Sequence, residues 1–367
     1  MEPKIRFKGF EGEWKASTIG DFCSVSIGEF VIKTKQNDNA PYPVYNGGSS
    51  YTGFYENYNQ EGPKVIVSAR GANAGVVNYC EKNFWAGNSC YSIATKDNRN
   101  LKFLYHCLKK NQSNYLNNQQ AANIPSISKK DIQETILVMP KSFEQQAIAS
   151  YFTSLDSQIS AATSRLASLK QMKAASLQAM FPQEGETVPK IRFKGFEGEW
   201  KEQSLSGHNF FIIAGGDVDK ILLQNNGKYP VIANALTNDG ILGYYMDSYR
   251  VDGPAVTVTG RGDIGIAIAR HYSFTPVVRL LSIKSNHNVD FLANAINCYK
   301  VAKESTGVPQ LTTAKLQEYR IKMPMNIDEE NAIGNYFTSL DRQISLQSQR
   351  LEKLKQIKSA CLDKMFV

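Results

Sequence analysis

The feature that most constrains the fold is a repeated segment. The thirteen residues PKIRFKGFEGEWK occupy positions 3–15 and occur again, without a change, at positions 189–201. A repeat of this length does not arise by chance in a chain of 367 residues. The sequence therefore predicts two related halves, each opened by the same segment.

A second repeat follows each half. Residues 147–181 align without gaps on residues 332–366 and agree at 21 of 35 positions. In each copy one set of positions recurs at alternating spacings of four and three, the heptad pattern of a helix that packs through a single seam. The two seams comprise Ile148, Phe152, Leu155, Ile159, Ala162, Leu166 and Leu169 in the first copy, and Ile333, Phe337, Leu340, Ile344, Gln347, Leu351 and Leu354 in the second.

Each copy predicts one helix roughly 50 Å long, at 1.5 Å per residue. An apolar stripe of this length needs a partner, so the economical prediction pairs the two helices as an antiparallel coiled coil that relates the halves by a pseudo-two-fold axis. The alternative is two separate amphipathic helices, each docked on its own domain. The first helix is rich in Ala and Ser and the second in charged residues, so the pair need not be symmetric in detail.

The residues outside the helices predict two α+β domains. Residues 1–142 and 189–325 both contain Tyr-Pro-Val, a Gly-Pro before an apolar run, and two strand-like stretches around a glycine-rich turn. Each then has a short helix (101–110 and 289–300), a capped shorter helix and a strand that ends in Met-Pro. The predicted boundaries are 1–142, a helix over 143–181, a Pro/Gly/Glu linker over 182–188, a second domain over 189–325, and a helix over 326–367.

Charge is concentrated in the two domains. The chain carries a net charge of +8, of which residues 1–142 contribute +5 and residues 189–325 contribute +4, whereas the helical segments are near neutral. Two basic domains suggest two contacts with a polyanion such as nucleic acid. A soluble protein that is merely basic is the alternative on charge alone.

Several protein classes are disfavoured by composition. The chain has no run of eighteen apolar residues and no apolar segment near its N-terminus of the kind found in secretory signals. Its six cysteines form no C-x-x-C pair, and its four histidines are not at ligand spacing. We therefore expect a cytoplasmic protein with reduced thiols, no metal centre and no membrane segment.

The glycine-rich turns are the first candidate contact sites. The segments VIVSARGANAGVV (65–77) and AVTVTGRGDIGIAIA (255–269) place Arg70 and Arg261 at corresponding positions of a strand–turn–strand unit. Arginine is well shaped to read guanine or to clamp a phosphate. The candidate DNA-binding residues of these turns are Arg70, Gly71 and Asn73 in the first copy, and Arg261, Gly262 and Asp263 in the second. The alternative is an ordinary turn whose glycines only satisfy φ.

Two further loops, 45–60 and 232–249, are rich in amides and hydroxyls, which suit contacts with base edges and the sugar-phosphate backbone. Asn46 and Ser49 in the first loop, and Asn234 and Thr237 in the second, are candidate contacts. The tyrosines of these loops are more typical of packing.

Catalytic motifs are missing from the sequence. It contains no Walker-type G-x-x-x-x-G-K-[ST], no Gly-x-Ser-x-Gly and no H-E-x-x-H, and no two prolines are adjacent, which excludes an Asn/Asp-Pro-Pro-Tyr motif. Asp217 and Asp219 lie close together without a residue that would complete a metal site. The sequence thus predicts no catalytic residue and no metal ligand.

Taken together, the repeated PKIRFKGFEGEWK opening and the repeated helix that begins EQQAIASYFTSLDSQI resemble the specificity (S) subunit of type I DNA restriction–modification systems, over essentially the whole chain. The resemblance implies two target-recognition domains, each reading one half of a bipartite duplex DNA target, and a coiled coil that sets the spacer and docks two methyltransferase (M) subunits. Restriction (R) subunits would join them. S-adenosylmethionine, ATP and Mg²⁺ would then belong to the partner subunits, and this chain would be non-catalytic.

Two other functions compete with this one. A methyltransferase with fused recognition domains is disfavoured by the missing motifs. A coiled-coil assembly scaffold without direct base readout is disfavoured by the basic domains and the paired Gly-Arg turns.

Overall fold

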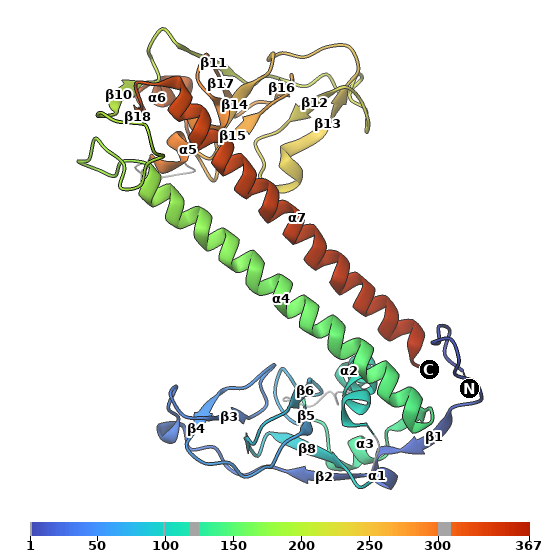
Figure 1. Ribbon diagram of the computed structural model, residues 1–367. Coiled ribbons are helices and arrows are strands. Elements are labelled where there is room, and N and C mark those ends of the chain that lie inside the picture. Colours follow the sequence, from blue (N-terminus) through green and yellow to red (C-terminus); the bar gives the residue numbers. More distant parts are fainter. Residues whose placement is uncertain (1, 98–99, 118–124, 300–309) are drawn as a thin grey trace. The chain divides into compact units, whose positions relative to one another are not determined.

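A computed structural model describes residues 2–97, 100–117, 125–299 and 310–367 (Figure 1). The chain divides into two compact units. The first comprises Met1–Thr163 with Gln349–Val367, and the second comprises Ser164–Ser348. The first unit therefore includes the last part of the chain, and both long helices contribute to both units.

In its described residues, the first unit contains three antiparallel or mixed sheets, three α-helices of its own and one part of each long helix. Its four-stranded sheet has the order β2-β8-β5-β6, its three-stranded sheet the order β4-β3-β7, and β1 pairs with β9. The elements are β1 (Lys15–Thr18), α1 (Ile19–Phe22), β2 (Cys23–Ile27), η1 (Lys33–Lys35), β3 (Tyr42–Tyr45), β4 (Gly53–Tyr55), β5 (Lys64–Ser68), β6 (Val77–Cys80), β7 (Trp85–Ala86), β8 (Cys90–Thr95), α2 (Leu101–Asn117), α3 (Lys129–Gln133), β9 (Ile136–Met139) and the start of α4 (Ser142–Met180).

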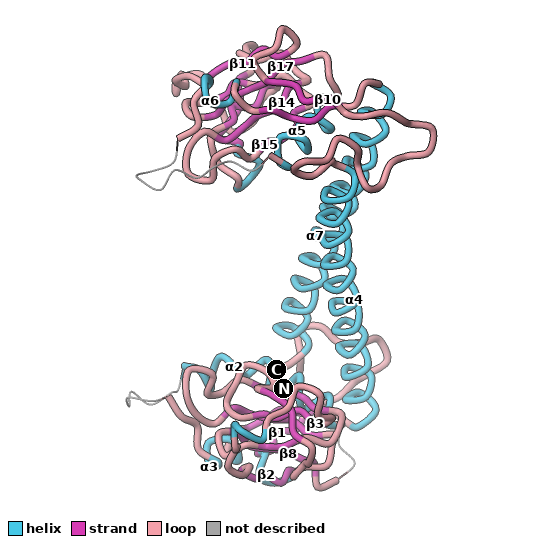
Figure 2. The backbone as a smooth tube through the Cα atoms, turned by 90° about the vertical axis from the view of Figure 1, so that its left-hand side faces the viewer, coloured by secondary structure: helices cyan, strands magenta, loops and turns pink. Residues whose placement is uncertain are grey.

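The second unit repeats the order of the strands, but among its described residues no α-helix corresponds to α1. Its sheets run β11-β17-β14-β15, β13-β12-β16 and β10-β18. The elements are β10 (Lys201–Ser204), β11 (Phe210–Ala214), β12 (Tyr229–Ile232), η2 (Thr237–Gly240), β13 (Ile241–Tyr245), β14 (Ala255–Thr259), β15 (Ala267–Arg270), β16 (Thr275–Pro276), β17 (Leu280–Ser285), α5 (Val289–Cys298), α6 (Thr313–Gln317), β18 (Arg320–Met323) and α7 (Ile327–Met365). Figure 2 shows the strands of each unit gathered in one block.

The predicted α+β class with an internal repeat is confirmed. Each glycine-rich turn joins two antiparallel strands, β5 to β6 and β14 to β15. The short helices α3 and α6 are capped as expected, because Ser128 accepts a hydrogen bond from Asp131 N (3.1 Å) and Thr312 accepts one from Lys315 N (3.3 Å). The helix predicted over 101–110 is longer, since α2 continues to Asn117.

The repeated segment joins each domain to its long helix. Arg6 donates two hydrogen bonds of 2.7 Å to the buried carboxylate of Glu144, at the start of α4, and Arg192 does the same to Glu329, at the start of α7, at 2.6 and 2.7 Å. Breaking such a pair leaves a buried charge without a partner, which is costly. Both copies of the segment therefore supply the same ion pair to the start of a long helix.

The remaining contacts of the segment involve the far end of a long helix. Ile5 N donates to Lys364 O, near the end of α7, and Ile191 N donates to Ala179 O, near the end of α4, both at 2.9 Å. Because α4 begins on the first domain and α7 on the second, each opening segment binds the start of one long helix and the end of the other.

The end of α7 completes the core of the first unit, and the end of α4 completes the core of the second. In the first unit Phe366 lies 5.4 Å from Phe103 and 5.5 Å from Phe152, between ring centroids. In the second unit Phe181 stacks on Phe291 at 5.4 Å and lies 5.8 Å from Trp200. The Met-Phe pair that ends each helix repeat is therefore a core element.

The antiparallel pairing of α4 with α7 is confirmed within each unit. In the first unit Lys358 donates to Asp156 at 2.5 Å, and in the second Lys173 donates to Asp341 at 2.6 Å. Most seam positions are buried: Ile148, Phe152, Leu155, Ala162, Leu169, Ile333, Phe337, Leu340 and Leu351. Ile159, Leu166, Ile344, Gln347 and Leu354 are half-buried.

Each helix also packs on its own domain, although the two helices are not separate as the alternative prediction required. Phe152 of α4 lies 4.9 Å from the ring of His106 on α2, and Phe337 of α7 is buried in one cluster with Phe291 of α5. The heptad seam thus serves two contacts, the partner helix along its length and the domain at one end.

Candidate nucleic-acid interface

The turn that carries Arg70 in the first unit is held by backbone hydrogen bonds to residues 125–127. Arg70 follows β5, and its backbone forms an isolated bridge with Ser126. Gly71 N donates to Pro125 O and Ile127 N donates to Ala69 O, both at 2.9 Å. Residues 125–127, before α3, therefore hold the turn by backbone hydrogen bonds, while the Arg70 side chain is exposed.

The second unit holds its turn in the same way. Arg261 forms an isolated bridge with Gln310, and Leu311 N donates to Gly260 O at 2.9 Å. The following glycines, Gly71 and Gly262, have φ of +83° and +75°, and a Cβ on either would have nothing within 4 Å. Their conformation, rather than lack of space, requires glycine, and the outer side of each turn is open.

Three loops of the first unit meet at this turn. A Cβ on Gly47 would lie 3.1 Å from Ser89 Cβ and 3.2 Å from Arg70 O. Asn46 Oδ1 accepts a hydrogen bond from Ser89 N at 3.2 Å, and Ser68 Oγ donates to Gly48 O at 2.8 Å. Loops 46–50, 69–76 and 87–89 therefore converge, and they bring Asn46 next to Arg70.

In the second unit Asn234 makes the equivalent connection with its side chain. Its Oδ1 accepts from Gly260 N at 2.7 Å and its Nδ2 donates to Arg261 O at 2.9 Å. The structure thus brings Asn234 and Arg261 together, but with both ends of the Asn234 amide committed to the turn backbone. The sequence predicted Asn46 and Asn234 as candidate base contacts. In this structure both connect neighbouring loops through these hydrogen bonds, and a contact with bases stays a prediction.

The other candidates lie on the same loops or next to them. Ser49 is exposed on the loop after Asn46, and Thr237 is exposed at the start of η2. Asn73 is half-buried, and its carbonyl accepts from Val76 N at 3.0 Å. Asp263 is exposed, and its carbonyl accepts from the Thr259 hydroxyl. A role of these side chains in reading bases stays a prediction.

One residue of this region was missed. Arg279, in the loop between β16 and β17, is exposed and has a φ of +77°. A Cβ on Gly260 would lie only 2.4 Å from Arg279 O, so this loop presses against the turn that carries Arg261. Its counterpart in the first unit is Ser89, so a comparison of the two halves gave no signal for an arginine here.

The electrostatics of the region come from these exposed guanidinium groups. Within residues 2–97, 100–117, 125–299 and 310–367, no hydrogen bond or ion pair involves the side chain of Arg70, Arg261 or Arg279. Burial raises the pKa of Tyr45, at the start of the first loop, so its phenol stays protonated. The converging loops thus present exposed guanidinium groups, with the exposed Asp263 carboxylate on the same turn as Arg261.

Among the described residues, no three His, Cys, Asp or Glu side chains are grouped so that they could hold a metal ion. None of the described helices is long and apolar enough to cross a membrane.

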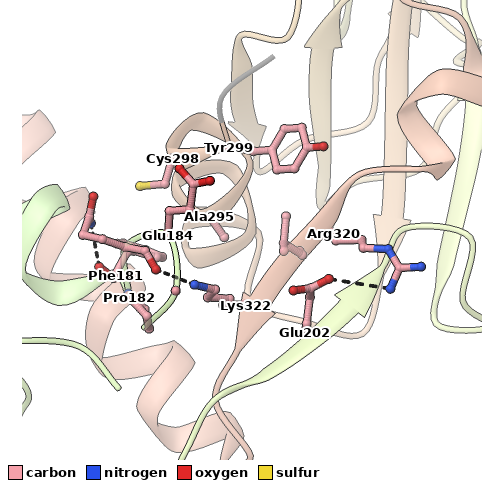
Figure 3. A pocket seen from close by; sticks show the side chains of 12 residues that line it. Phe181, Pro182, Glu184, Glu202, Ala295, Cys298, Tyr299, Arg320 and Lys322 are labelled. Carbon is pink, nitrogen blue, oxygen red and sulfur yellow. Dashed lines mark hydrogen bonds and ion pairs between the residues drawn. The ribbon is translucent and has the colours of Figure 1, made fainter. Parts of the chain in front are cut away.

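The second unit also has a cavity of about 360 Å³, formed by the linker after α4, the end of α5 and strands β10 and β18 (Figure 3). Its basic groups are already engaged. Arg320 pairs with Glu202 at 3.6 Å, and Lys322 donates to Glu186 O at 2.6 Å and to Gln183 O. The cavity therefore belongs to the joint between linker and domain, and not to the converging loops.

Comparisons with known proteins agree with this architecture. The family model for the type I restriction modification DNA specificity domain matches residues 11–171 and again residues 198–356. The chain belongs to this family. Within the family, the two matches correspond to the two domains with their helices, and the chain is a type I restriction–modification specificity subunit with DNA sequence specificity domains.

Relatives of the family cover nearly the same length. The type I specificity subunit S.MpnORF507P of Mycoplasma pneumoniae is 27% identical over 320 residues, which are 83% of this chain and 84% of that protein. S.MpnORF89P of the same organism is 25% identical over 319 residues, covering 82% and 93%. The crystal structure of a type I S subunit from M. genitalium has a TM-score of 0.80 at 18% identity and covers 100% of this chain and 99% of that one, which shows a shared fold.

Proposed function

We propose that each unit reads one half of a bipartite duplex DNA target through its converging loops. The observation that carries this proposal is that both units use the same framework to present an exposed arginine, Arg70 or Arg261, on a turn whose backbone is held from two sides. Arginine so placed can bond a guanine edge or a phosphate. The excess positive charge of both domains supports a polyanionic partner.

The paired helices set the distance between the half-sites and dock two methyltransferase subunits. The retention of 21 of 35 residues between the helix repeats, compared with the divergence of the loops, supports binding of like partners to both helices. Restriction subunits join the same complex. A solved neighbour of this chain, at a TM-score of 0.52 and 13% identity, is described as bearing on complex assembly of the type I restriction–modification system.

The chain itself is non-catalytic in this proposal. S-adenosylmethionine, ATP and Mg²⁺ bind to the partner subunits, and the complex acts in the cytoplasm. Binding of S-adenosylmethionine by the isolated chain in equilibrium dialysis would contradict the assignment of this cofactor to the partner subunits.

A selection experiment tests the readout. The chain assembled with its methyltransferase subunits is incubated with a duplex pool of randomised sequence, and the retained DNA is sequenced. We expect two short specified blocks separated by an unspecified spacer. Retention without any sequence preference, at an affinity that salt does not change, would favour the coiled-coil scaffold without base readout.

The spacer role has its own test. Insertion of one heptad into both α4 and α7, outside the residues that contact the domains, is expected to lengthen the spacer and leave both blocks unchanged. An unchanged spacer in the selected DNA would show that the helices do not set the distance between the half-sites.

A further inference from the structure

We propose that Arg279 is a second DNA-contacting residue of the second unit and acts together with Arg261, whereas the first unit has no matching arginine. This inference rests on the proposed function, because it names a specificity-determining residue at the same loops. It starts from the contact between the 277–280 loop and the Gly260–Arg261 turn.

The conformation of Arg279 is unusual for its residue type. Leu280 N donates to Val277 O at 3.0 Å, so residues 277–280 form a tight turn with Arg279 at its third position. A φ of +77° at this position is normally supplied by glycine or asparagine. A bulky residue kept at a left-handed φ is more typical of functional loops than of structural ones.

The first unit shows what a purely structural version of this turn looks like. Cys90 N donates to Gly87 O at 3.1 Å in the same turn, with Ser89 in the place of Arg279. Ala69 N donates to Ser89 O at 2.8 Å, which ties the two loops together directly. Ser89 is not among the residues with positive φ. A short polar side chain and an ordinary backbone are therefore sufficient for packing here.

The second unit has exchanged that backbone contact for a side-chain contact. Gly260 N, which corresponds to Ala69 N, donates to Asn234 Oδ1 instead. Arg279 O lies over Gly260, where a Cβ would come within 2.4 Å. The close approach of Arg279 O leaves no room for the Cβ that Ala69 has at the corresponding place, so Gly260 accompanies Arg279 in the second unit.

The result is two guanidinium groups on adjoining loops. Both side chains are exposed, and both lie on loops whose backbones are fixed by hydrogen bonds. Binding of DNA therefore requires little further ordering of these loops. Two such groups can hold two neighbouring acceptors of a duplex, such as a guanine edge and the adjacent phosphate.

The test uses the full chain assembled with its methyltransferase subunits and the duplex selected for that complex. Arg279→Gly removes the side chain and fits the left-handed φ, so the variant should fold with an unchanged or higher Tm. We expect its affinity for the selected duplex to fall about tenfold or more. Arg279→Lys keeps the charge and should retain part of the affinity if a phosphate is contacted, but not if a base edge is.

The control is Arg320→Ala, which removes the same charge from the same unit on β18, where Arg320 pairs with Glu202. It should leave the affinity within about twofold. A reselection from the randomised pool should show that Arg279→Gly alters only one specified block, and that Arg70→Ala alters the other.

The outcomes separate this inference from the proposed function. If the unmodified complex selects a split motif but Arg279→Gly binds it with unchanged affinity and salt dependence, the role of Arg279 is refuted and the proposed function stands. Equal loss at both blocks would likewise refute a local contact. If the unmodified complex selects no motif at all, the proposed function itself fails.

Discussion

The two units differ least where they bind the long helices and most where their loops converge. The Arg6–Glu144 and Arg192–Glu329 pairs have nearly the same geometry, and Phe366 and Phe181 fill corresponding places in the two cores. Ser89 and Arg279, by contrast, occupy one position with different charge and backbone conformation. The framework is repeated because it meets the same helices, whereas the loops are free to diverge because they face outward.

The largest expected effect concerns the helix ends. Phe366→Ala should destabilise the first unit and Phe181→Ala the second, each by about 3–5 kcal/mol, because each removes a buried ring from one core. Hydrogen exchange followed by mass spectrometry would locate the loss. The exposed Phe143 provides a control, since Phe143→Ala should cost almost nothing. A loss of protection spread equally over both units would show that the cores are not separate.

The joints come next. Arg6→Ala should lower the stability of the first unit, because the carboxylate of Glu144, 3% exposed, is left without its partner. Arg192→Ala should do the same to the second unit through Glu329. Thermal unfolding would measure both. The double variant Arg6→Ala with Glu144→Gln should recover part of the loss, and no recovery would argue against the ion pair as the cause.

The two turns should separate the units functionally. Arg70→Ala and Arg261→Ala should each weaken binding at one half-site by about 1–3 kcal/mol, if each guanidinium contacts a base edge. Titration of the assembled complex with duplexes scrambled in one block or the other would assign each effect. Equal loss at both blocks from either variant would contradict separate readout.

A smaller difference should appear on acidification. His106 of the first unit is 1% exposed and burial, with nearby Lys358 and Lys102, lowers its pKa to about 3, whereas Asn294 occupies the corresponding place in the second unit. The unfolded chain, with a His pKa near 6.5, then binds more protons, so stability falls as the pH decreases below that value. The slope for one proton is at most about 1.4 kcal/mol per pH unit.

His106→Asn should remove this contribution, so the stability of the first unit should fall less steeply as the pH decreases. Chemical unfolding at several pH values would measure it. A first unit whose stability is the same between about pH 7 and pH 5 would show that His106 is not held neutral.

Much of the framework could be predicted from the sequence, because repeats and heptads are local patterns. The hairpins around Arg70 and Arg261 and the capped helices α3 and α6 followed from glycine, Ser128 and Thr312 at fixed spacings. The burial of Phe181 and Phe366 in cores reached by the far helix ends could not be predicted, because it depends on contacts between residues distant in sequence.

The sequence predicted which loops form the candidate site, but not the hydrogen bonds that its side chains make. Asn234 has a side chain that can read a base edge. Its amide is bonded instead to the backbone of Gly260 and Arg261, and the sequence does not show that another loop brings these two residues within hydrogen-bonding distance. Arg279 carried no motif and had no arginine at the matching position. The roles of the remaining side chains toward DNA stay predictions.

The most direct test of separate readout is a genome-wide map of adenine methylation in cells that make this chain with its methyltransferase subunits. Exchange of residues 15–142 for those of a relative with a different target should change one half of a split motif and leave the other half and the spacer unchanged. Methylation that does not depend on the chain, or an exchange that alters both halves together, would contradict the account.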